Sequence, residues 1–181
     1  MNQAPPIQAP KQGEKYWKFD PVPQDGMTVA ILAGSNFLTN HTPNYPDAKT
    51  MAQAVELFYA VEQEGNYYFV KTFPTNYSMH EKSNYSALTK AITGSLPVEG
   101  SSVDDLIGKP VMLNLANEDK VSKAKNTPYT ITKVTDKPMP VPVAMVDQAP
   151  DAVAAIEAFE AEIARQEAEG EDQSTEDQPP F

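Results

Sequence analysis

The sequence predicts a mainly β protein, in which five strands form a barrel and one helix lies between the third and fourth strands. The first observation is a set of runs rich in β-branched and aromatic residues, which strands favour. The second is the Gly, Asn, Asp and Pro residues that separate these runs as turns. The third is a single internal segment with helix signals. We expect strands at residues 27–32, 51–62, 67–73, 111–115 and 128–135.

The second strand needs justification, because residues 51–62 also contain good helix formers. β-branched, aromatic or leucine side chains occupy every second position, at Val55, Leu57, Tyr59 and Val61. This strict period of two favours a strand with these four residues on its core face. A turn at residues 64–66 leads into residues 67–73, the most β-prone run of the chain. The two runs are therefore expected to form a hairpin.

The internal helix is expected at residues 79–92. Ser78 and Glu81 have the spacing of a capping box at its start, and Gly94 provides its stop. The order strand, strand, strand, helix, strand, strand is that of the OB-fold, a five-stranded barrel. A ferredoxin-like alternation needs a second internal helix, which this order lacks. The proline-rich stretch after residue 136 ends the strands, because proline cannot donate to a ladder.

Charge divides the chain into unequal parts. Residues 1–146 hold 13 lysines and 14 acidic residues, a net charge of −1, whereas residues 147–181 hold one arginine and 11 acidic residues, a net charge of −10. The overall charge of −11 therefore describes an acidic tail and does not exclude a basic patch on the body. We divide the chain into a disordered Pro/Gln-rich arm (1–15), a barrel domain (16–146) and a tail (147–181).

The tail contains a segment that can form a helix at residues 151–169, with Gly170 as its stop. Its apolar stripe is narrow, and its other faces are acidic. The helix is expected either to pack on the barrel or to form on meeting a partner. The stripe consists of Val153, Ile156, Phe159 and Ile163.

Several classes of function are disfavoured by what the sequence lacks. There is no cysteine, which excludes disulfides and thiolate chemistry, and two histidines are too few for a histidine-rich metal site. No P-loop, zincin or nucleophile-elbow motif occurs, so we expect no enzymatic activity, no cofactor and no metal. The sequence has neither an apolar stretch that could span a membrane nor a signal peptide, which predicts a cytosolic protein.

Several segments in order resemble a known family. Residues 77–83 (YSMHEKS), a helix, residues 105–115 (DLIGKPVMLNL), residues 129–131 (YTI) and residues 138–140 (PMP) resemble the pattern of bacteriophage single-stranded DNA-binding proteins with an OB-fold. The likeness spans about residues 25–142. It implies a non-catalytic protein that coats single-stranded DNA during replication or recombination in the cytoplasm of the infected bacterial host. This chain departs from the family in having no arginine in its body.

The carboxyl terminus carries an independent likeness. Acidic residues followed by Pro-Phe resemble the tip of bacterial single-stranded DNA-binding proteins, which in that family docks replication and repair partners. A terminal carboxylate beside an aromatic ring suits capture by a basic pocket. The alternative is a solubilising tail that happens to stop at phenylalanine. The residues that match the tip are Glu176, Asp177, Pro180 and Phe181.

Single strands are bound by aromatic faces that stack on bases and by cations along the backbone. The third strand places one alternating set of side chains on one face, and because this set includes a lysine we expect it to face outward. Phe58 on the second strand is expected either to face outward or to be buried under the helix or the amino-terminal arm. Trp17 either stacks on bases or closes the barrel end, and we favour closure. The outward set is Tyr67, Phe69, Lys71 and Phe73.

The loop at residues 118–127 flanks the groove in which OB-folds bind ligands. Its lysines are expected either to contact DNA or to form a solvated hairpin tip, and residues on one face of the last strand extend the patch. The residues concerned are Lys120, Lys123, Lys125, Tyr129 and Lys133.

The rival hypothesis is a phage structural or host-interaction protein that uses its acidic Pro-Phe tail and binds no DNA. The near-neutral body without arginine favours this alternative. A monomer and an oligomer are both compatible with the sequence.

Overall fold

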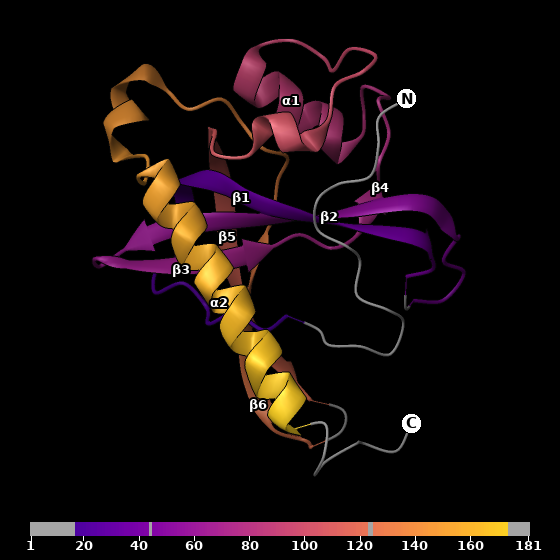
Figure 1. Ribbon diagram of the computed structural model, residues 1–181, viewed down its shortest axis with the longest axis vertical. Coiled ribbons are helices and arrows are strands. Elements are labelled where there is room, and N and C mark those ends of the chain that lie inside the picture. The colour runs from indigo at the N-terminus through magenta and orange to yellow at the C-terminus, as the bar shows by residue number, and fades with distance from the viewer. Residues whose placement is uncertain (1–16, 44, 123–124, 174–181) are drawn as a thin grey trace.

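The protein is described here by a computed structural model, whose described residues are 17–43, 45–122 and 125–173, with side chains described to residue 169. Its central element is one antiparallel sheet in the order β3-β2-β1-β5-β6, with the short strand β4 paired to β2. The two outer strands of this order also approach each other, so the sheet nearly closes into a barrel (Figure 1). The strands are β1 (Gly26–His41), β2 (Met51–Gln63), β3 (Asn66–Lys71), β4 (Thr75–Asn76), β5 (Pro110–Val121) and β6 (Pro128–Val134).

This order confirms the predicted fold class. The first, second and third long strands are neighbours, and the chain then crosses over to pair β5 with β1. The helix α1 (Asn84–Thr93) occupies the crossover, between the third and fourth long strands. A five-stranded antiparallel barrel with its helix at this place has the OB architecture.

The β2–β3 hairpin confirms that residues 51–62 form a strand. Gln63 and Asn66 are paired, and the two residues between them, Glu64 and Gly65, have φ values of 53° and 77°. Positive φ at both central residues is the geometry of a type I′ turn, whose twist matches that of the strands it joins.

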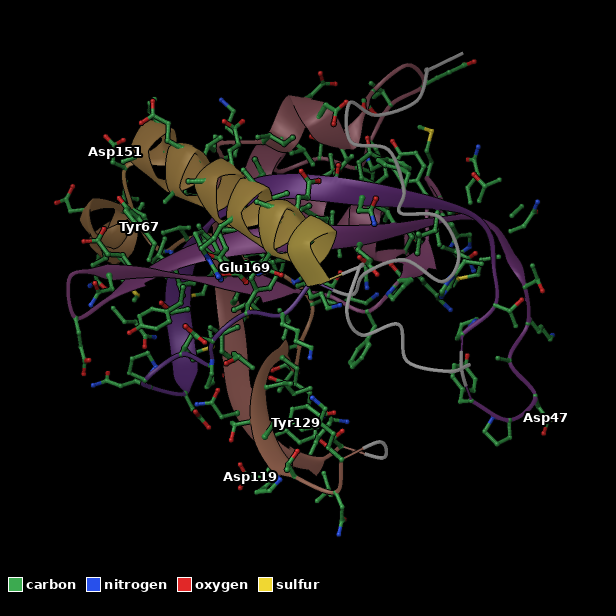
Figure 2. All side chains as sticks on the ribbon, turned by 60° about the horizontal axis from the view of Figure 1, so that its bottom comes forward. Asp47, Tyr67, Asp119, Tyr129, Asp151 and Glu169 are labelled. Atoms are coloured by element: carbon green, nitrogen blue, oxygen red, sulfur yellow. The ribbon has the colours of Figure 1, made fainter. Side chains whose placement is uncertain are left out.

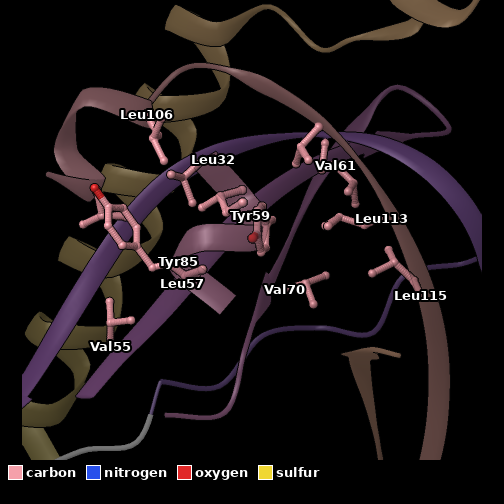
Figure 3. Packing of buried hydrophobic residues seen from close by; sticks show 14 of the residues in the cluster. Leu32, Val55, Leu57, Tyr59, Val61, Val70, Tyr85, Leu106, Leu113 and Leu115 are labelled. Atoms are coloured by element: carbon pink, nitrogen blue, oxygen red, sulfur yellow. The ribbon is translucent and has the colours of Figure 1, made fainter. Parts of the chain in front are cut away.

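The sheet has two apolar faces, and each covers its own cluster of buried side chains. On the inner face, Val55, Leu57, Tyr59 and Val61 pack with buried residues from β1, β3 and β5 (Figure 3). β6 contributes only the half-buried Val134 to this cluster. These four residues form the predicted core face, which is confirmed. On the outer face, Ile31, Phe58 and Ala60 belong to a second cluster. The alternation along β2 therefore separates two cores instead of a core and a solvated face.

The helix α1 closes the barrel interior, because its side chains Tyr85 and Leu88 belong to the inner cluster. It ends at Gly94, as predicted, with a left-handed φ of 84°. Its predicted start is wrong. Ser83 is the cap, since its Oγ accepts from the amide of Ser86 at 3.0 Å, whereas Ser78 accepts from His80 in the preceding turn.

A capping box does occur, but on the short 3-10 helix η1 (Val103–Leu106). The Oγ of Ser102 accepts from the amide of Asp104 at 3.2 Å, and the Asp105 carboxylate accepts from the amide of Ser102 at 3.0 Å. The acidic pair Asp104–Asp105 therefore has a structural role at a helix start. Val103 and Leu106 bury their side chains in the inner cluster beside α1.

The acidic helix α2 (Ala152–Gln173) lies across the outer face of the sheet (Figure 1). Its buried side chains are Ala155 and Phe159, so the helix packs on the barrel. Two details of its prediction are wrong: the helix continues through Gly170, and Val153 is 67% exposed. The 3-10 helix η2 (Val143–Gln148) precedes it. Among the described residues, no helix is long and apolar enough to span a membrane.

Candidate nucleic-acid interface

Part of the predicted stacking surface is covered by α2. Phe58 is 1% and Phe69 is 9% exposed, and the ring of Phe159 lies 5.2 Å from the first and 5.6 Å from the second, between centroids. Phe19 packs edge-on against both rings. Phe58 is therefore buried, the second of the two alternatives stated for it, and the expectation that Phe69 faces outward with a free ring is wrong. We call Phe19, Phe58, Phe69 and Phe159 the covered aromatic surface.

Two further aromatic residues support this cover. Trp17 and Tyr67 are half-buried and pack against the same cluster, so Trp17 belongs to the helix-covered face and does not close the barrel end. The backbone amide and carbonyl of Lys18 both hydrogen-bond the side-chain amide of Gln166, at 3.0 and 2.6 Å. The amino-terminal segment is thereby fixed along α2.

The end of β3 and the segment that follows it form an open site beyond the part of the strand that α2 covers. Lys71, two residues beyond Phe69, and Phe73, four residues beyond, line a pocket of about 250 Å³. The opposite wall comes from the end of β6, with Lys133, and from the segment after it, with Lys137. We call this the seam pocket, because it lies where β3 and β6 meet without the ladder of hydrogen bonds that joins the other strands. The side chain of Phe73 is 65% exposed at this site.

A strip of side chains leads from the seam pocket along β6. Tyr129, Ile131 and Lys133 alternate on one face of this strand, and four residues of strand span about 13 Å. Lys120 of β5 is paired with Tyr129. Figure 2 shows Tyr129 and Asp119 on the β5–β6 hairpin, which projects from the rest of the barrel. Tyr129 is 45% exposed.

Glu118 reduces the positive charge of this strip. Its carboxylate lies 2.7 Å from the Nζ of Lys133 and 3.8 Å from that of Lys120. The hydrogen bond from Lys133 is the main cause that lowers the pKa of Glu118 below its ordinary value, so the carboxylate stays ionised to a lower pH than that of an unpaired glutamate. Two of the predicted DNA-contacting lysines therefore share one counter-ion.

The lysine-bearing loop is shorter than predicted, because β5 continues to Val121. Lys120 is consequently a strand residue. Lys125 lies in the connection to β6 and is exposed, and its amide donates to the Oγ of Ser122 at 3.4 Å. Lys123 lies outside the described residues, and so do the four residues of the carboxyl-terminal tip, Glu176, Asp177, Pro180 and Phe181.

Sequence reasoning missed Lys137 and Tyr59 as residues of this region. Lys137 follows the last strand, and its Nζ donates to the backbone carbonyl of Lys82 at 2.9 Å, which fixes it beside the segment before α1. The signal for Lys137 was its place directly after β6. Tyr59 was predicted as a core residue and is one, but it also lines the seam pocket.

Of the ten predicted DNA-contacting residues, Lys71, Phe73 and Lys133 meet in the seam pocket. Tyr129 and Lys120 lie along the strip, while Phe58, Phe69 and the half-buried Tyr67 lie under α2. No group of three or more His, Asp or Glu side chains in the described part of the chain could hold a metal ion. The comparisons of this chain with protein-family models, with curated proteins and with solved structures find no match.

Proposed function

We propose that the protein binds single-stranded DNA without catalysis, through the seam pocket and the strip along β6. The observation that carries this proposal is the exposed ring of Phe73 beside Lys71, Lys133 and Lys137. Aromatic faces for stacking and cations for the phosphates are the two components of sequence-tolerant single-strand binding. The OB-like barrel supports the proposal, because such barrels recurrently bind oligonucleotides.

The distribution of charge supports the same path. The acidic helix α2 covers a different region, the outer face of β1, β2 and β3, where its carboxylates would repel phosphates. The seam pocket is lined by three lysines and by one carboxylate, that of Asp136, which accepts from the side-chain Nδ2 of Asn114 at 2.9 Å. The bound single-stranded DNA therefore follows the part of the barrel surface that the acidic helix does not cover.

The wider role follows from the resemblance described above. The protein acts as a phage single-stranded DNA-binding protein in the cytoplasm of the infected bacterial host, where it protects single strands during replication or recombination. The tip at Phe181 recruits replication or recombination proteins. A peptide of residues 171–181 should compete for such a partner with the full chain, and removal of Phe181 from the peptide should abolish competition.

The test is the fluorescence anisotropy of a labelled oligo-dT and of a duplex of equal length, at two salt concentrations. We expect saturable binding of the single strand that weakens with salt. The double variant Lys71→Gln, Lys133→Gln should bind less tightly and lose roughly 0.7 from the salt slope per phosphate contact removed. Lys90→Gln, on the exposed side of α1, is the matched control and should bind as the parent does.

A structural or host-interaction protein is the alternative, and one observation favours it. Val143, 93% exposed, and Val146, 52% exposed, stand three residues apart on η2, a spacing that aligns side chains on a 3-10 helix. A folded protein that binds no single strand at low salt would favour this alternative and overturn the proposal.

A further inference from the structure

Two residues that line the seam pocket carry buried hydroxyl groups that the fold itself does not satisfy. The Oη of Tyr59 and the Oγ1 of Thr75 are buried, and neither has a hydrogen-bond partner among the described residues. Both residues line the pocket. Tyr59 is 0% exposed and stands among the interior side chains shown in Figure 3. By contrast, Thr72 in the same wall is satisfied, since its Oγ1 accepts from the amide of Leu57 at 2.9 Å.

An unpartnered buried hydroxyl is costly, and native proteins rarely leave one without a partner. Two such groups in one pocket indicate that something else supplies their hydrogen bonds when the site is occupied. A hydroxyl both donates and accepts, so the complementary group is one with donors and acceptors on the same edge. The edge of a nucleobase has this character, whereas a phosphate oxygen only accepts.

The dimensions and lining of the pocket suit one base. Its volume of about 250 Å³ is below the roughly 300–1,000 Å³ of ordinary small-molecule sites, so it admits one heterocycle and no run of nucleotides. Leu57, Val134 and Pro138 provide apolar wall for the ring. Lys71, Lys133 and Lys137 come from both sides of the pocket, where the phosphates on either side of that base can be held.

We propose that the seam pocket takes one base of the bound strand out of the base stack, with its edge hydrogen-bonded to Tyr59 and Thr75. This inference rests on the proposed function and adds a site to it. The neighbouring bases stack on Phe73, in the pocket wall, and on Tyr129, on the strip along β6. The protein thus holds one nucleotide by its edge and its neighbours by their faces.

The principal test is Tyr59→Phe, which removes one hydroxyl and keeps the ring. Because the free protein loses an unsatisfied polar group, its melting temperature should stay the same or rise. Its affinity for oligo-dT should nevertheless fall about 2- to 10-fold, the usual effect of losing one hydrogen bond. A purely structural role for the hydroxyl would lower stability instead. Tyr67→Phe, on the face under α2, is the matched control and should change neither quantity.

A second ligand shows whether a base or a phosphate occupies the pocket. An oligomer of equal length that carries abasic sugars throughout should bind the parent and Tyr59→Phe equally, because it has no base to insert. Equal losses on both ligands would show that a phosphate occupies the pocket, and this would overturn the proposal. Binding of oligo-dT that is unchanged by Tyr59→Phe would also overturn it, while leaving single-strand binding intact. If the parent binds no single strand at all, the proposed function itself fails.

Discussion

β3 and the segment that follows it have a covered part and an open part. Phe69 lies against Phe159 of α2, whereas Phe73, four residues further along the chain, is 65% exposed in the seam pocket. Both residues belong to one alternating set, and the sequence assigns them one role. The difference shows that the exposure of a side chain depends on an element far away in the sequence, because Phe159 of the helix at Ala152–Gln173 is 90 residues from Phe69.

The largest expected effect is on the covered part. Phe58→Ala removes a ring that is in contact with both Phe19 and Phe159, so the free energy of unfolding should fall by about 3–5 kcal/mol. Urea unfolding followed by circular dichroism measures this. At concentrations where the variant is still folded, its affinity for oligo-dT should equal that of the parent. A large loss of affinity in the folded variant would mean that α2 leaves this face when DNA binds.

Phe73→Ala is expected to do the converse of Phe58→Ala: it should weaken DNA binding and leave stability almost unchanged. The side chain is largely exposed, so the free energy of unfolding should change by no more than about 0.5 kcal/mol. Affinity for oligo-dT should fall by about 1–3 kcal/mol if the ring stacks on a base. A variant that lost stability and kept its affinity would show that Phe73 is a packing residue like Phe69, which would contradict the difference between the two parts.

Glu118→Gln should strengthen binding, because it frees Lys133 and Lys120 from their shared carboxylate. We expect a roughly two- to fivefold gain in affinity for oligo-dT at low salt, and a smaller gain at high salt. Since the pKa of Glu118 lies below its ordinary value of 4.5, the gain should persist from pH 7 down to pH 5. Anisotropy titrations at both pH values test this. Glu99→Gln, an exposed loop residue before η1, serves as the control.

The smallest effect is expected at the boundary between the two parts. Burial is the main cause that raises the pKa of Glu56, which stands on β2 two residues before Phe58, and the charge of Lys71 opposes this shift. A carboxyl with a raised pKa binds its proton more tightly in the folded state, so stability falls as the pH rises from 4.5 through the folded-state pKa. Glu56→Gln should remove this part of the pH dependence. Thermal melts between pH 4.5 and 7 measure it, and parallel curves for the two proteins would contradict it.

Local signals were sufficient for individual elements of the barrel. The strict alternation from Val55 to Val61, the positive-φ turn at Glu64-Gly65 and the stop at Gly94 are each properties of a few neighbouring residues, and each prediction is confirmed. The predicted start of α1 was wrong because two serines, Ser78 and Ser83, compete for the cap position. Ser78 has the better sequence pattern, but Ser83 holds the helix amide.

The candidate site was predicted only in part, because its exposure is a tertiary property. No residue near Phe58 in the sequence indicates that Phe159 will cover it. Likewise, nothing near Glu118 in the sequence indicates that it will pair with Lys133 of the neighbouring strand. Lys71 and Phe73 could be selected from their alternation and chemistry. That they face Lys133 and Lys137 across the seam follows from closure of the barrel, which sequence spacing does not specify.

The contact between Lys18 and Gln166 joins residues that are 148 positions apart. At a synthesis rate of roughly 5–20 residues per second, the second of them is made roughly 7 to 30 s after the first. Within that interval, from the moment Phe58 and Phe69 have been made, the nascent chain carries them without the helix that buries them. An aromatic sheet face in this condition is a surface for chaperones and for other nascent chains. The last helix to be translated therefore also sets how long the ribosome-bound protein is at risk of aggregation.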